Sequence, residues 1–422
     1  MVNYNTTGLS NGLRIIHLPS ASDVIYCGIG IKAGSRHEQQ GEEGLAHFCE
    51  HLSFKGTRRR SAVQVINAIE GVGGELNAFT NKEDTMFYCA ISKQHFQRAV
   101  DVLLDIVFCS TYPQVEVEKE REVVCDEIES YEDTPSELIF DDFENLLFTG
   151  HPLGHNILGT REQVRSYASD DALRFTHRHY RPENAIFFVS GNIDFLQLCQ
   201  ICEGRVGGGE GGRRGKPADA PAGWQRGEAA DALAGWQRGE APLIIRHRGT
   251  HQAHVIIGTT AFSADDSRRW SLYLMNNILG GPGLNSRLNL ALRERRGLVY
   301  SVDSSMVSYS DTGLWTTYFG CDPADVRRCC RLVRTELNRL MDRPLTDRQL
   351  QAAKLQLQGQ LAIASDNREQ FALDFAKNFL HTGKQRDLTD IMRHIDGLTP
   401  QDLQQTATTL FADNRLVTLV YQ

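Results

Sequence analysis

The stretch Ala46-His47-Phe48-Cys49-Glu50-His51-Leu52 decides how the rest of this chain is interpreted. In a helix, residues i, i+3 and i+4 lie on one face, so His47, Glu50 and His51 point the same way. Two imidazoles four residues apart can bind one metal ion, and the carboxylate between them can reach a water on that ion. The stretch therefore predicts a hydrolytic zinc centre. The alternative is a helix with one packed and one solvated histidine, because short motifs also recur by accident.

A catalytic zinc site needs a third protein ligand, which is often a carboxylate. The acidic run from Val115 to Glu129 has a helical pattern and offers several carboxylates. Spacing alone does not choose among them, so Glu127 competes with Glu122, Asp126 and Glu129.

Further short motifs follow the metal motif along the chain. They are Leu52-Ser53-Phe54-Lys55-Gly56-Thr57, Gly74-Glu75-Leu76-Asn77-Ala78-Phe79-Thr80, Tyr131-Glu132-Asp133-Thr134-Pro135, His151-Pro152-Leu153-Gly154 with Gly159-Thr160, and Tyr180-Arg181-Pro182-Glu183-Asn184. With these motifs the chain resembles the pitrilysin family of zinc peptidases, the H-x-x-E-H inverzincins. That family includes insulin-degrading enzyme and the mitochondrial processing peptidase. The resemblance covers nearly the whole chain and fits a short, two-domain, bacterial-type member.

The resemblance implies a set of residues for the metal centre. In the family, a glutamate ligand follows the H-x-x-E-H motif by about 76 residues, and another glutamate precedes that ligand by seven. Glu127 and Glu120 stand at these positions. We therefore expect one Zn²⁺ per chain, held by His47, His51 and Glu127, with Glu120 supporting the site and Glu50 acting as the general base. For Glu120, a solvated helix face is the alternative.

Two further groups of residues gain a role only through the resemblance. Arg293 and Tyr300 are expected to reach the substrate from the metal-free half and to donate to the developing oxyanion. Without the resemblance, Arg293 would belong to a basic, solvated helix end. The strand residues Asn77, Ala78 and Phe79 are expected to pair their backbone with an extended substrate. The alternative for Phe79 is packing within its sheet.

Chain length and composition suggest two domains around a linker. At 422 residues the chain exceeds the roughly 250–300 residues at which a single core stops growing. We expect a metal-binding catalytic domain over 1–203, a glycine-rich linker over 204–242 and a homologous metal-free domain over 243–422. The linker contains the identical repeat Ala-Gly-Trp-Gln-Arg-Gly-Glu-Ala at 222–229 and 234–241. Such a composition cannot bury a core.

The predicted fold is α+β, with two homologous α/β repeats, each a mainly antiparallel sheet backed by helices. The expected helices of the first half span 42–55, 61–70, 93–109 and 115–147. Those of the second half span 268–279, 285–295, 324–341 and 347–363. The expected strands span 13–18, 25–32, 75–80, 85–91, 185–190, 243–247, 255–260 and 416–421.

Net charge and apolar patterning exclude several kinds of partner. A net charge of −8 and a pI near 6.0 give no electrostatic reason to expect nucleic acid or an anionic membrane. No stretch has the roughly 20 apolar residues that span a bilayer, and the N-terminus does not resemble a signal peptide. Ten scattered cysteines fit a reducing compartment. We expect a cytoplasmic protein, or a periplasmic one if a presequence has been removed.

The expected function is the hydrolysis of peptide bonds in extended or unfolded peptides. Fused relatives in the family join two such two-domain units and close them around the substrate. We therefore expect a homodimer with a composite active site. A non-catalytic or partner-dependent subunit of a peptidase complex is the alternative. An intact set of His47, Glu50, His51 and Glu127 argues against it.

Overall fold

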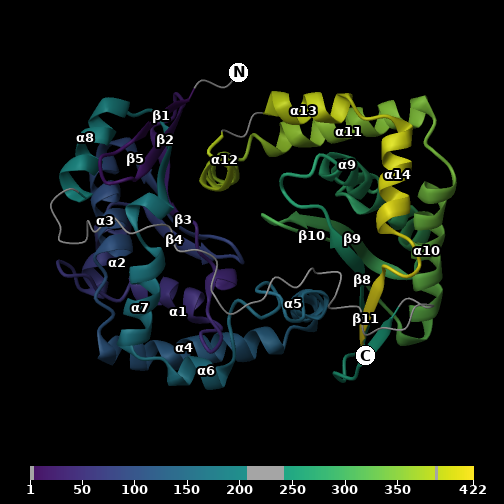
Figure 1. The fold of residues 1–422 in the computed structure, drawn as a ribbon, viewed down its shortest axis with the longest axis horizontal. Coiled ribbons are helices and arrows are strands. Elements are labelled where there is room, and N and C mark those ends of the chain that lie inside the picture. Colours follow the sequence, from purple (N-terminus) through teal and green to yellow (C-terminus); the bar gives the residue numbers. More distant parts are fainter. Residues whose placement is uncertain (1–3, 207–241, 385–387) are drawn as a thin grey trace. The chain divides into compact units, whose positions relative to one another are not determined.

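The computed structural model describes residues 4–206, 242–384 and 388–422 (Figure 1). Contacts between residues divide the chain into two compact units. The first comprises Met1–Glu129, His155–Gln225 and Ala364–Asp387, and the second comprises Ser130–Gly154, Arg226–Ile363 and Leu388–Gln422. The predicted linker and its internal repeat lie almost entirely outside the described residues.

The first unit is built on a six-stranded sheet in the order β1-β2-β6-β3-β5-β4. Its neighbouring strands are antiparallel except for the parallel pair β2 and β6. The strands are β1 Asn5–Gly8, β2 Arg14–Pro19, β3 Val24–Ile31, β4 Glu75–Thr80, β5 Thr85–Ser92 and β6 Ala185–Gly191. β4 ends the order, so one of its edges has no strand neighbour among the described residues.

Among the described residues of the first half, the first five helices correspond to the four expected ranges, and the last three have no counterpart among those ranges. The helices are α1 Leu45–Ser53, α2 Ala62–Glu70, α3 Phe96–Phe108, α4 Gln114–Glu132, α5 Pro135–Leu147, α6 Arg161–Ser166, α7 Ser169–His179 and α8 Phe195–Val206. Ser61 caps α2, because its side chain accepts a hydrogen bond from the amide of Gln64.

Two helix predictions in this half were wrong in extent. The single helix expected over 115–147 is two helices, because α4 ends at Glu132 and α5 begins at Pro135. Proline lacks an amide donor, and it disfavours helical backbone in the residue before it. The metal helix starts at Leu45 rather than near residue 42, since Gly44 takes a left-handed φ of 94° at its N-cap.

The second unit repeats this architecture with a five-stranded sheet in the order β7-β11-β8-β10-β9. Its strands are β7 Leu243–Arg246, β8 Ala253–Ala261, β9 Val299–Ser308, β10 Gly313–Cys321 and β11 Val417–Tyr421. Its helices include α9 Arg269–Gly280, α10 Val326–Asp342, α11 Asp347–Ala364, α13 Leu388–Asp396 and α14 Pro400–Leu410. The helix expected over 285–295 contains a π-helical stretch, Asn289–Glu294. The predicted α+β fold with two homologous repeats is confirmed.

Each sheet is covered on its second face by a helix from the opposite half of the sequence. In the first unit, α12 Arg368–Thr382 packs on β2, β3 and β6 and forms an apolar cluster with Ile16, Met86 and Phe188. In the second unit, α5 packs on β8 and β11 around Phe143 (Figure 1). Both faces of each sheet carry apolar side chains, and each face must be buried. Each compact unit therefore contains a helix from the other half of the sequence, whereas the predicted domains were continuous in sequence.

Candidate metal centre

Helices α1 and α4 bring two imidazoles and a carboxylate together. His47 Nε2 lies 3.8 Å from Glu127 Oε1, and His51 Nε2 lies 3.4 Å from Glu127 Oε2. One ligand atom from each of the three residues lies within 4.8 Å of the other two. Zinc–ligand bonds of about 2.0–2.2 Å in a tetrahedron separate neighbouring ligand atoms by roughly 3.4 Å. The observed separations fit one zinc ion.

Packing in the core determines which face of α1 is available for the metal centre. Leu45, Ala46, Phe48, Cys49 and Leu52 are buried in the main apolar cluster of the first unit. The remaining face carries both histidines and Glu50, as the i, i+3, i+4 pattern predicted.

α4 faces the metal centre with an acidic side and the core with an apolar one. Val117, Val124 and Ile128 are buried in the core, whereas Glu127 is exposed. This placement favours Glu127 as the third ligand. Glu127 approaches both histidines, whereas Glu122 pairs with Arg165 and Glu129 pairs with Arg161.

Glu120 is a buried carboxylate that holds His51. Its Oε1 accepts a hydrogen bond of 3.0 Å from His51 Nδ1, and its Oε2 lies 2.7 Å from Lys55 Nζ. Burial opposes ionisation, but the hydrogen bonds from His51 and Lys55 outweigh it and lower the pKa of Glu120. Only 4% of Glu120 is exposed, so it is not part of a solvated helix face.

The imidazole of His51 lies between two carboxylates. Burial alone would lower its pKa, but the hydrogen bonds with Glu120 and Glu127 raise the pKa of His51 to about 9. The negative surroundings therefore favour a positive charge at this place, whether a proton or a metal ion. His47 differs, since burial and the neighbouring His51 lower its pKa to about 4. A neutral imidazole is the form that binds metal.

Glu50 lies on the same helix as His47 and His51, but it is not one of the three residues whose ligand atoms come together. It is 7% exposed, and its Oε2 accepts a hydrogen bond of 2.6 Å from Thr80 Oγ1 at the end of β4. Burial raises the pKa of Glu50, while the bond from Thr80 opposes that rise. A carboxylate with a raised pKa suits a general base that later returns its proton.

Sequence reasoning assigned no role to Thr80 or Lys55, although both lie inside motifs that it quoted. Lys55 lies four residues after His51, at the helical spacing that places side chains on one face. That spacing was a signal that could have been used. Thr80 gives no such signal, because its contact with Glu50 spans 30 residues between a strand and a helix.

The predicted substrate strand is the last in the order of its sheet among the described residues, and its side chains are divided between the two faces. Ala78 packs against the core on the side of α1, whereas Phe79 packs on the opposite face beside Tyr88. Lys377 of α12 lies 5.9 Å from the Phe79 ring centroid. The side chain of Phe79 thus packs within its unit, and the backbone role of Asn77, Ala78 and Phe79 stays a prediction.

Arg293 and Tyr300 lie together in the second unit. The guanidinium carbon of Arg293 is 5.9 Å from the Tyr300 ring centroid, and Tyr300 on β9 is 84% exposed. The Tyr300 side chain is therefore accessible from solvent. The structure brings this pair together, and it places the three metal ligands in the first unit.

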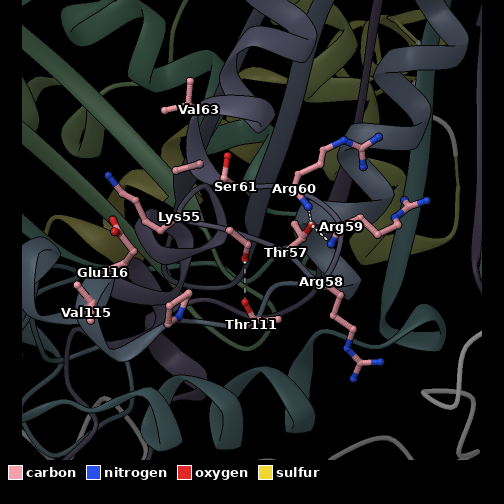
Figure 2. Close-up of a pocket in the computed structure, with 13 residues that line it drawn as sticks. Lys55, Thr57, Arg58, Arg59, Arg60, Ser61, Val63, Thr111, Val115 and Glu116 are labelled. Atoms are coloured by element: carbon pink, nitrogen blue, oxygen red, sulfur yellow. Dashed lines mark hydrogen bonds between the residues drawn. The ribbon is translucent and has the colours of Figure 1, made fainter.

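A pocket of about 560 Å³ is lined by Lys55 and the segment that follows it, together with residues at the start of α4. Figure 2 shows Lys55 and Glu116 on one side, and the side chains of Arg58, Arg59 and Arg60 directed away from them. Arg59 and Arg60 both pair with Asp101 and Asp105. The three metal ligands are not among the residues that line this pocket.

Two family profiles match this chain. The profile of the family described as "Insulinase (Peptidase family M16)" matches residues 15–161, and the one described as "Peptidase M16 inactive domain" matches residues 167–357. The chain is 35% identical to "Uncharacterized zinc protease SCO5738" of Streptomyces coelicolor, over 95% of this chain and 86% of that protein. It is 31% identical to "Uncharacterized zinc protease YmxG" of Bacillus subtilis, over 97% of this chain and 96% of that protein.

Solved structures share the fold at low sequence identity. A protease from Helicobacter pylori superposes with a TM-score of 0.90 at 20% identity, covering 100% of this chain and 99% of that chain. A peptidase M16 inactive domain from Pseudomonas fluorescens superposes with a TM-score of 0.86 at 17% identity, covering 99% of this chain and 97% of that chain.

The helices of residues 4–206, 242–384 and 388–422 include none with the length and apolar character of a membrane span.

Proposed function

Because the chain belongs to peptidase family M16, we propose that it is a zinc metalloendopeptidase that hydrolyses peptide bonds of extended or unfolded peptides. The observation that carries the proposal is the closeness of His47, His51 and Glu127. One ligand atom from each lies within 4.8 Å of the other two, which is close enough for all three to bind one zinc ion. The names of the relatives support the zinc, and the geometry of Glu50 supports the hydrolysis.

Each residue of the centre has its own proposed role. His47, His51 and Glu127 would hold the metal, and zinc when bound supplies a Lewis acid for the water and the scissile carbonyl. Glu50 takes a proton from the attacking water and delivers it to the leaving amine. Thr80 orients the carboxylate of Glu50.

The open edge of β4 supports a substrate in extended conformation. A peptide that adds to this edge would pair with the backbone of Asn77, Ala78 and Phe79. Because Thr80 closes the same strand and touches Glu50, a peptide on the edge would run toward the general base. Recognition by the backbone selects for extended conformation more than for one side chain.

Arg293 and Tyr300 are assigned to the oxyanion. A phenol and a guanidinium are suitable donors for a carbonyl oxygen that gains charge. We propose a homodimer in which Tyr300 of the partner subunit acts on a substrate held beside His47 and His51. Tyr300 is 84% exposed, so its side chain is accessible to another molecule.

One observation favours a second candidate, a non-catalytic or partner-dependent subunit. Residues 167–357 match the family described as the inactive domain. That match covers the half without H-x-x-E-H, whereas the complete metal set lies before residue 167. The peptidase is therefore preferred.

Metal analysis with a peptide digest tests the proposal. We expect about one zinc per chain, loss of peptidase activity on chelation and its return on adding zinc. A peptide library would also report the cleavage preference. Purified protein with all three ligands intact but without stoichiometric metal would overturn the proposal, as would zinc-loaded protein that cleaves no peptide.

A further inference from the structure

The metal helix α1 is capped by a carboxylate that lies outside the metal centre. Glu38 follows the short 3₁₀ helix Ser35–His37 and is 1% exposed. Its Oε1 accepts a hydrogen bond of 2.7 Å from the amide of Ala46, and its Oε2 accepts one of 3.0 Å from the amide of Gly44. Helix N-termini leave such amides without a partner, and a nearby side chain normally supplies one. The N-cap Gly44 has no side chain, so Glu38 takes this role from six residues upstream.

Glu38 is itself held by a residue from a distant part of the first unit. His155 Nε2 lies 2.8 Å from Glu38 Oε2 and 3.1 Å from the carbonyl oxygen of Ser35. Lys82 Nζ donates to the carbonyl oxygen of His155, and Lys82 is 3% exposed. A buried carboxylate bound by an imidazole and two amides has little freedom to move.

The position of this cap matters for the metal. His47 directly follows Ala46, whose amide Glu38 binds, and His51 lies one turn further along the same helix. A shift or rotation at this end of α1 would move both imidazoles relative to Glu127 on α4. Metal affinity depends on such positioning to within a few tenths of an ångström.

We propose, on the basis of the zinc centre above, that Glu38 is a positioning residue that sets the metal geometry through α1, with His155 holding Glu38 in place. The hydrogen bonds of Glu38 go to the amides of Gly44 and Ala46 and to His155, and none of these is a metal ligand. Its loss should loosen the ligand geometry while the sheet and the core remain folded.

The test compares Glu38→Gln with wild type by zinc competition against a chromophoric chelator and by the absorption spectrum of the cobalt-substituted protein. The amide has one carbonyl oxygen, and its NH₂ group would face a backbone N–H. We expect zinc binding about 10- to 100-fold weaker and altered cobalt bands. Glu42→Gln is the matched control, because the carboxylate of Glu42 in the same segment accepts from the amide of Gln39 at 3.0 Å and pairs with Arg178 on α7, and neither partner lies in α1.

A second pair of variants tests the link to His155. His155→Ala should weaken zinc binding in the same direction as Glu38→Gln, whereas His155→Gln keeps a donor and should restore part of the affinity. Wild-type zinc affinity and cobalt bands in Glu38→Gln would overturn the inference. If Glu38→Gln does not fold, wild-type affinity in His155→Ala would overturn it instead.

The two proposals can fail separately. A wild-type protein that binds zinc but cleaves no peptide would overturn the peptidase, while weaker zinc binding in Glu38→Gln would still support the role of Glu38. A wild-type protein that binds no zinc would overturn both.

Discussion

Thr80 Oγ1 donates a 2.6 Å hydrogen bond to Glu50 Oε2 and thereby joins the edge strand β4 to the metal helix α1. The strand proposed to hold the substrate and the proposed general base thus meet in one contact. Glu50 is buried, and this bond fixes the orientation of its carboxylate.

Glu50→Gln should keep its zinc and lose turnover, because an amide cannot accept the proton of water. The expected loss in kcat is about 10²–10⁴-fold. Metal content and kcat are measured on the same preparation. Loss of the metal would identify Glu50 as a ligand, and near-normal kcat would rule out its role as the base.

Thr80→Val should reduce kcat about 10-fold while KM changes little. The substitution keeps the shape of the side chain and removes the donor to Glu50, and hydrogen bonds to charged groups contribute about 1.5–3 kcal/mol. Thr80→Ser keeps the hydroxyl and serves as the control. A Thr80→Val enzyme with the kcat of Thr80→Ser would show that the bond does not orient Glu50.

Glu120→Ala should weaken zinc binding about 10- to 100-fold, as expected when the partner of a metal-binding histidine is lost. His51 would keep its place on α1 but lose the carboxylate that orients its ring. Glu122→Ala on the same helix is the matched control, since Glu122 is exposed and pairs with Arg165. Equal zinc affinity in the two variants, measured by chelator competition, would contradict this assignment.

Mixing two inactive variants tests the proposed composite site. Glu50→Gln and Tyr300→Phe homodimers should each be poor enzymes. If sites form between chains, each exchanged heterodimer contains one site with both residues intact, and activity should rise toward about half of wild type. Native mass spectrometry verifies the exchange. Confirmed heterodimers without recovered activity would reject the composite site.

Acid should destabilise the first unit through two neighbouring histidines, His179, which is buried, and His37, which is partly buried. Burial lowers the pKa of His37 to about 4 and that of His179 to about 3. Since an unfolded histidine titrates near pH 6.5, the unfolded chain binds more protons below that pH. Stability is therefore complete above about pH 6.5 and falls as the pH drops toward the folded pKa values.

His179→Phe should flatten this dependence, because the substituted ring cannot take up a proton. Melting temperatures between pH 7 and pH 4.5 measure the slope. His177→Gln is the control, since His177 is exposed on the same helix. A slope that remains as steep in His179→Phe as in wild type would exclude His179 as a source of the acid sensitivity.

The sequence by itself determined the face of the metal helix. Helical spacing sufficed to place His47, Glu50 and His51 together, because a local period of 3.6 residues fixes which side chains are neighbours. The resemblance to a known family then selected Glu127 among several carboxylates. The α+β repeats followed from the succession of strand and helix patterns, since each pattern is local.

Only the tertiary structure decided the contacts that support the site. Thr80 reaches Glu50 across 30 residues, and His155 reaches Glu38 across 117. Nor did any local pattern show that α5 and α12 each cover a sheet from the other half of the sequence. The physical reason is the same in each case. Such contacts depend on how apolar faces are buried in three dimensions, and no period in the sequence records which distant segment will cover a given face.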